Sequence, residues 1–125
     1  MTPEKSEELV EDFLKYFKVG VTHHFKIEEK ALFPILRSNV KDAEPFISEL
    51  ISEHKDIINK YFKLQNGFTQ TRDLTDLLKA LSTHAGKEER VLPPLIAFLN
   101  GEQLQKIDEL TKRLGYSLLA VESQS

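Results

Sequence analysis

Two segments of the sequence, sixty residues apart, carry the same pattern of histidine, glutamate and proline: HHFKIEEKALFP at residues 23–34 and THAGKEERVLPP at residues 83–94. In each segment a histidine is followed four residues later by a glutamate, as His24 by Glu28 and His84 by Glu88. On a helix, side chains four residues apart lie one turn from each other on the same face. Each segment therefore predicts an imidazole beside a carboxylate, a mixed donor pair that suits iron.

The elements that must position these residues are predicted to be helices throughout. The chain has only 5 glycines and 5 prolines, and β-branched residues alternate nowhere over a sustained stretch. Start and stop signals predict a first helix that starts after Thr2-Pro3-Glu4 and runs to about residue 38, and three more at about residues 45–65, 71–99 and 102–121. Joined by short loops, four such helices form an antiparallel up-down bundle, so the predicted fold class is all-α.

The apolar stripes of the first three predicted helices are interrupted by residues that can bind metal. The interrupting residues, all at positions that the helical period assigns to the core, are His24, Glu28, His54, His84 and Glu88. In an up-down bundle the three histidines lie at similar distances from the intervening loops. At ~1.5 Å per residue, they fall within about a turn of the same height. The fourth stripe, from Leu104 to Val121, is wholly apolar and predicts a place in the core.

Three imidazoles and two carboxylates inside an apolar bundle require something that neutralises them. No lysine or arginine falls on these stripes, and an unpaired buried carboxylate is costly. A metal ion removes the difficulty, because carboxylates on facing helices can bridge two metals. A single histidine on an apolar face is more often a hydrogen-bonded core residue. Five ligand-type residues at one height favour metal binding instead, and these five are the predicted ligands.

Length and composition exclude several other classes of protein. A chain of 125 residues, 40% hydrophobic and 30% charged, is expected to form one globular domain over residues 1–125. The net charge of −3 and the absence of a basic stripe argue against nucleic-acid binding. No apolar run approaches the roughly 20 residues of a membrane span, and we expect no signal peptide. There is no cysteine, so thiolate sites are excluded, and a cytoplasmic location fits best.

Motifs of the common enzyme classes are missing. The sequence has no His-Glu-x-x-His zinc motif, no glycine-rich phosphate loop and no nucleophile elbow. The two glutamates could act as acid and base, but one turn from histidines they are better interpreted as ligands. Oxidase or peroxidase activity at a metal is compatible with the pattern, since related di-iron bundles carry out oxygen chemistry. The sequence leaves enzyme activity undecided and favours binding over catalysis.

The ordered set of motifs resembles the hemerythrin-like domain, also called the HHE cation-binding domain. The resemblance covers about Glu7 to Leu99 and rests on HxxxEE followed by LFP, then EH at residues 53–54, then HxxxEE followed by LPP. It implies a four-helix bundle that holds a non-haem di-iron centre with an oxo or hydroxo bridge. By this analogy two glutamates bridge the irons and three histidines are terminal ligands: Glu28, Glu88, His24, His54 and His84.

The sequence departs from the family pattern in one respect. The usual pattern begins with an earlier helix that carries its own histidine, and this chain starts after the point where that helix should be. We expect the fourth predicted helix to take that place beside the first, directing Leu114 and Leu118 toward the metal. One ligand would then be missing and one metal held more weakly. The candidate replacements are His23, Tyr116, water or a residue of a partner chain.

The sequence therefore predicts a small hemerythrin-like iron protein that binds or senses dioxygen, nitric oxide or iron itself. Reversible binding needs an open coordination position and an apolar pocket, and the missing ligand and the many phenylalanines suggest both. The competing interpretation is a metal-free or decayed bundle that acts as an interaction module. A homodimer is favoured by the missing helix, because a partner chain could supply it. No nucleic-acid or membrane partner is expected.

Overall fold

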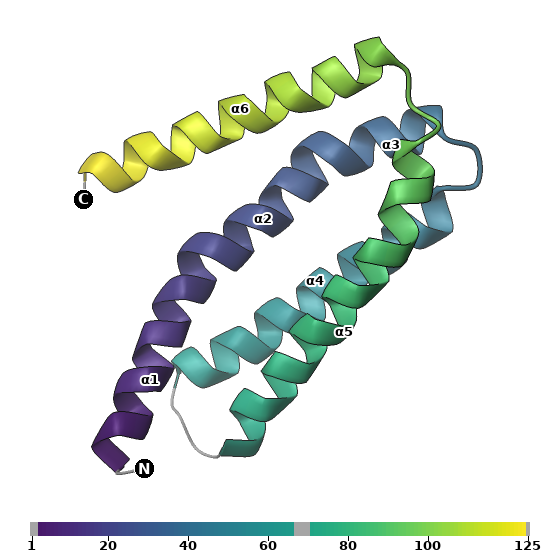
Figure 1. Ribbon diagram of the computed structural model, residues 1–125. Coiled ribbons are helices and arrows are strands. Elements are labelled where there is room, and N and C mark those ends of the chain that lie inside the picture. Colours follow the sequence, from purple (N-terminus) through teal and green to yellow (C-terminus); the bar gives the residue numbers. More distant parts are fainter. Residues whose placement is uncertain (1–2, 67–70, 125) are drawn as a thin grey trace.

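The computed structural model describes residues 3–66 and 71–124, with side chains described for residues 8, 11–66 and 72–115. The helical elements, in chain order, are α1 (Pro3–Tyr16), η1 (Phe17–Val21), α2 (Thr22–Ile27), η2 (Glu28–Leu32), α3 (Phe33–Asn39), α4 (Glu44–Gln65), α5 (Thr71–Ile96) and α6 (Gly101–Gln124). The first five follow one another without a break, so the described residues form four helical rods and no strand (Figure 1). The predicted all-α class is confirmed. None of the described helices combines the length and apolarity that a membrane crossing requires.

The core lies between the long rod α1–α3 and the antiparallel pair α4 and α5 (Figure 1). One half of it surrounds the loop between α3 and α4, with residues such as Phe33, Leu36 and Ile47 fully buried. The other half lies toward the N-terminal end of the rod and includes Phe17 and Ile57. The predicted ligands sit between these two apolar halves, at the level where the long rod faces α4 and α5.

Two wide π-helical turns interrupt the long rod, and the sequence prediction did not include them. At η1 the N–H of Thr22 donates to the carbonyl of Phe17, five residues back. The Thr22 hydroxyl donates to the carbonyl of Lys18, four residues back in the same wide turn. At η2 the N–H of Phe33 reaches the carbonyl of Glu28. Pro34 follows and has no N–H to continue the α-helical ladder, which favours the wider turn here.

Two further prolines, Pro93 and Pro94, lie inside the third predicted helix. Helix α5 continues through Pro93 and Pro94 and ends at Ile96, three residues before the predicted end at Leu99. The carbonyl of Pro93 still accepts a hydrogen bond from the N–H of Ala97. The two prolines therefore do not end the helix before the loop that leads into α6.

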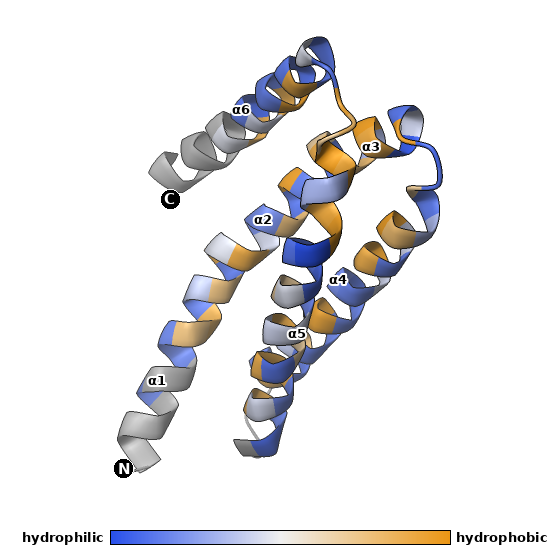
Figure 2. Ribbon diagram, turned by 45° about the vertical axis from the view of Figure 1, so that its right-hand side comes forward, coloured by the Kyte–Doolittle hydropathy of each residue, from blue (hydrophilic) through white to orange (hydrophobic). Residues whose placement is uncertain are grey.

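Helix α6 lies on the predicted side of the molecule but is not part of the core as predicted. It contacts η2 and α2, beside which it lies in Figure 2, and it diverges from α1 toward its C-terminal end in Figure 1. None of its described side chains is buried: Leu104 is 44% exposed, while Ile107 packs only against the edge of the core. Because α6 contacts the long rod obliquely, this contact cannot bury the whole apolar stripe of α6. Leu114 is half-buried, and the side chains of Tyr116 and Leu118 lie outside the described ones.

Candidate metal centre

Four of the five predicted ligands form a compact cluster between the long rod, α4 and α5. One donor atom from each of Glu28, His54, His84 and Glu88 lies within 4.8 Å of the others. The Nε2 atom of His54 is 3.1 Å from Glu28 Oε1 and 3.5 Å from Glu88 Oε1. The Nε2 atom of His84 is 2.6 Å from Glu88 Oε1. The helical heights inferred from the sequence therefore bring together these residues of three separate helices.

The fifth predicted ligand, His24, lies at the outer edge of this cluster. Its Nε2 atom is 3.4 Å from Glu28 Oε1 and 3.5 Å from Glu88 Oε2. The side chain is 59% exposed, whereas His54 is fully buried. Glu88 thus contacts all three imidazoles, and His24 forms the side of the cluster that faces solvent. His23 is half-buried and does not belong to the group of four.

The donor atoms at the centre of the cluster lack hydrogen-bond partners. Glu28 Oε1, His54 Nε2, His84 Nε2 and Glu88 Oε1 are buried, and within the described residues none makes a hydrogen bond of good geometry. A buried polar atom without a partner costs roughly 1–3 kcal/mol, so four in one place call for an explanation. All four are electron-pair donors directed at one small volume. Two imidazoles and two carboxylates in this arrangement fit a transition-metal cation such as iron.

A second layer of carboxylates supports both buried histidines. Nδ1 of His54 donates to Glu29 Oε2 at 2.8 Å, and Nδ1 of His84 donates to Glu53 Oε1 at 2.8 Å. Because an ionised carboxylate only accepts, these contacts place a proton on Nδ1, so that Nε2 is the nitrogen available to a metal once the imidazole is neutral. This is the arrangement by which carboxylates orient metal-binding histidines. Neither Glu29 nor Glu53 was expected from the sequence to take this role.

Aromatic packing holds the His54 ring in place. Phe25 stacks on it with ring centroids 3.8 Å apart and an angle of 11° between the planes. Phe33 lies near the ring as well, at 5.8 Å and 17°. Phe25 also meets His84 edge-on, at 5.4 Å and 76°. The His54 ring therefore has little freedom to rotate, and the stacked apolar rings keep water from its faces.

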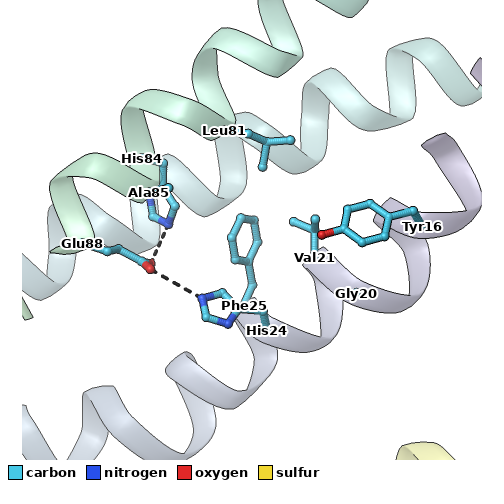
Figure 3. A pocket seen from close by; sticks show the side chains of 9 residues that line it. All are labelled: Tyr16, Gly20, Val21, His24, Phe25, Leu81, His84, Ala85 and Glu88. Atoms are coloured by element: carbon cyan, nitrogen blue, oxygen red, sulfur yellow. Dashed lines mark hydrogen bonds and ion pairs between the residues drawn. The ribbon is translucent and has the colours of Figure 1, made fainter.

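Two cavities border the cluster on its solvent side. One, of about 350 Å³, lies between the long rod and α5; apolar residues such as Val21, Phe25 and Leu81 line it, and His24 and Glu88 close one end (Figure 3). The other, of about 480 Å³, lies between η2, α5 and α6 and also reaches His24 and Glu88. A small molecule can therefore reach the cluster beside His24 without unfolding of the core.

Charge in the metal-free cluster is balanced by protons on the imidazoles. Burial alone would raise the pKa of Glu88, but its contacts with three histidines outweigh this and hold its pKa well below the usual range. Burial alone would lower the pKa of His54, but its contacts with Glu28, Glu88 and Glu29 raise its pKa to about 9. Burial raises the pKa of Glu28 above its ordinary value. At neutral pH, His54 of the metal-free protein therefore carries a proton on Nε2.

Metal binding is expected to release protons and to tighten as pH rises. A metal at His54 must displace the Nε2 proton, so affinity should increase with pH up to about 9, the raised pKa of this group, and therefore throughout the window from its ordinary pKa of 6.5 to about 9. The stability of the metal-free protein should fall over the same window, because the raised pKa stabilises the fold only while His54 is protonated. Competition with a chelator under anaerobic conditions at several pH values measures the affinity for ferrous iron. An affinity that does not change in this window would contradict the assignment of His54.

Comparison with known families agrees with this geometry. The family model of the hemerythrin HHE cation-binding domain matches residues 2–113, most of the chain. The protein therefore belongs to the hemerythrin HHE family. The match is wider than the stretch from Glu7 to Leu99 on which the motifs lie, and it includes the first half of α6. No curated protein and no solved structure matched the chain. Family membership implies cation binding, for which the buried cluster is the candidate site.

Proposed function

We propose that this protein is a non-haem iron protein whose centre holds two ions and binds dioxygen or nitric oxide. The observation that carries the proposal is the set of four buried donor atoms without hydrogen-bond partners, contributed by Glu28, His54, His84 and Glu88. Desolvation of such a set opposes folding unless a metal cation or protons on the imidazoles compensate it, and a metal-free interaction module would have no function for it.

The positions of the carboxylates and the histidines suggest which of them would bridge two metal ions and which would bind only one. Glu88 contacts three imidazoles, and Glu28 contacts those of His24 and His54, so both carboxylates lie between histidines. This is where a bridge between two metals belongs, and the histidines would be terminal ligands. When bound, iron supplies the redox and ligand-binding chemistry, and the chain supplies the donor atoms, their orientation and the dry surroundings.

The cavity of about 350 Å³ supports a small, weakly polar ligand. Its walls include Val21, Phe25 and Leu81, and its inner end is formed by His24, His84 and Glu88. Apolar walls favour a diatomic molecule over hydrated anions. The exposed His24 marks the side on which the protein supplies the fewest buried ligands. We propose that the ion on this side is the more weakly held one and the one that a diatomic ligand approaches.

Spectroscopy of the reconstituted protein tests this function. After anaerobic loading with ferrous iron, addition of dioxygen or nitric oxide should produce new visible absorption bands. Leu81→Phe, which narrows the cavity without touching a ligand residue, should leave the iron content unchanged and slow the response to nitric oxide. Iron-loaded protein whose spectrum is unaffected by both gases would show that the centre serves another purpose.

A further inference from the structure

The carboxylate of Glu53, next to the candidate metal centre, accepts a hydrogen bond on each of its two oxygens. Glu53 accepts from His84 Nδ1 through Oε1 at 2.8 Å and from Lys87 Nζ through Oε2 at 2.7 Å. Lys87 also contacts Glu49. Glu49 and Glu53 lie one turn apart on α4, and His84 and Lys87 lie one turn apart on α5. The contacts therefore join two helices next to a predicted ligand, with each Glu53 oxygen occupied by a different partner.

This ion pair differs from the surface pairs of the molecule. The side chains of Lys87 and Glu53 are 19% and 28% exposed, whereas those of Lys112 and Asp108 are 77% and 60% exposed. Exposed pairs contribute little to stability because water screens them, and partial burial strengthens the attraction. Without Lys87, Glu49 and Glu53 would repel each other one turn apart on the same face. The Glu53 carboxylate would then be drawn toward solvent and away from His84.

The other buried histidine, His54, is held mainly by aromatic stacking. His54 donates to Glu29, and in residues 8, 11–66 and 72–115 no ion pair joins Glu29 to a lysine or arginine. Two stacked phenylalanine rings hold His54 instead. His84 meets Phe25 only edge-on, so its orientation depends more on Glu53.

We propose that Glu53 and Lys87 are positioning residues of the metal centre. Lys87 fixes the Glu53 carboxylate, and Glu53 fixes the His84 ring with its proton on Nδ1 and Nε2 facing the cluster. This role lies outside the ligand set and rests on the proposed metal-binding function. Neither residue belongs to the cluster of four predicted ligands, so both would act only through the orientation and tautomer of His84.

The test compares three lysine variants. Lys87→Met removes the charge at similar length, Lys87→Arg keeps it, and Lys60→Met removes the surface pair with Asp56 as a matched control. Nitrogen NMR of the metal-free protein, at a pH where His84 is neutral, reports its tautomer; chelator competition reports affinity for ferrous iron. Lys87→Met should give a mixture of His84 tautomers and a roughly tenfold loss of affinity. Lys87→Arg should keep the single His84 tautomer and the affinity of the parent protein, and Lys60→Met should change neither property.

An unchanged tautomer and affinity in Lys87→Met would overturn the proposal. If Lys87→Met does not fold, Glu53→Gln provides the same test, because glutamine keeps the shape but loses the charge that binds Lys87. Failure of the proposed function is a separate outcome: the parent protein would then bind no iron, while the His84 tautomer would still report whether Lys87 acts through Glu53.

Discussion

Glu88→Gln is expected to remove most of the iron that the protein binds. Glutamine has nearly the same shape, but it replaces a carboxylate that contacts His24, His54 and His84 with a neutral amide. Loss of a second-layer residue already lowers metal affinity by roughly 10–100-fold, and loss of a shared ligand should exceed that. Elemental analysis after anaerobic reconstitution and desalting measures the effect.

The neighbouring Glu89 provides the matched control. It is exposed and lies outside the cluster of four, so Glu89→Gln should keep the parent's iron content. His54→Ala should lose iron as Glu88→Gln does, since it removes a fully buried donor. If Glu88→Gln and Glu89→Gln both fold and have the same iron content, iron binds outside this cluster.

Loading with iron is expected to raise the melting temperature by roughly 10 °C. A ligand that binds only the folded state stabilises it by about 2.7 kcal/mol at a hundredfold excess over Kd, and each kcal/mol shifts the midpoint of a domain of this size by several degrees. The effect should be large because the metal also satisfies four buried donor atoms. Calorimetry of metal-free and iron-loaded protein measures the shift.

The Glu88→Gln variant distinguishes stabilisation by iron bound at the cluster from a general effect of iron on the protein. Saturating iron should leave its melting temperature nearly unchanged, and a chelator should return the loaded parent to the metal-free midpoint. A parent protein whose melting temperature is the same with and without iron would argue against a site coupled to the core.

The helices could be predicted because periodicity and stop signals act locally. Apolar stripes at helical spacing located α4 and α5, and α4 ends at Gln65 as predicted. The two π turns depend on backbone details around Thr22 and Pro34 that an apolar stripe does not record. The stripe of α6 identifies an amphipathic helix, but whether Leu104 is buried depends on how closely that helix meets its neighbours.

The cluster could be predicted for a different reason. A histidine or carboxylate on an apolar stripe is conspicuous, and similar loop distances place His54 and His84 at one height. Glu29, Glu53 and Lys87 could not be recognised in the same way. One step off a stripe, a charged residue looks like a solvated one, and its distance from an imidazole on the next helix depends on how the two helices are rotated about their axes.

Metal stoichiometry of the parent protein, reconstituted anaerobically with ferrous iron and freed of excess metal, tests the central claim most directly. Two iron ions per chain are expected, with the first lost under mild chelation because His24 leaves its side of the centre exposed. The second ion should stay until a stronger chelator is used. A folded parent protein that retains no iron under these conditions would contradict the account and leave a helical bundle without a metal centre.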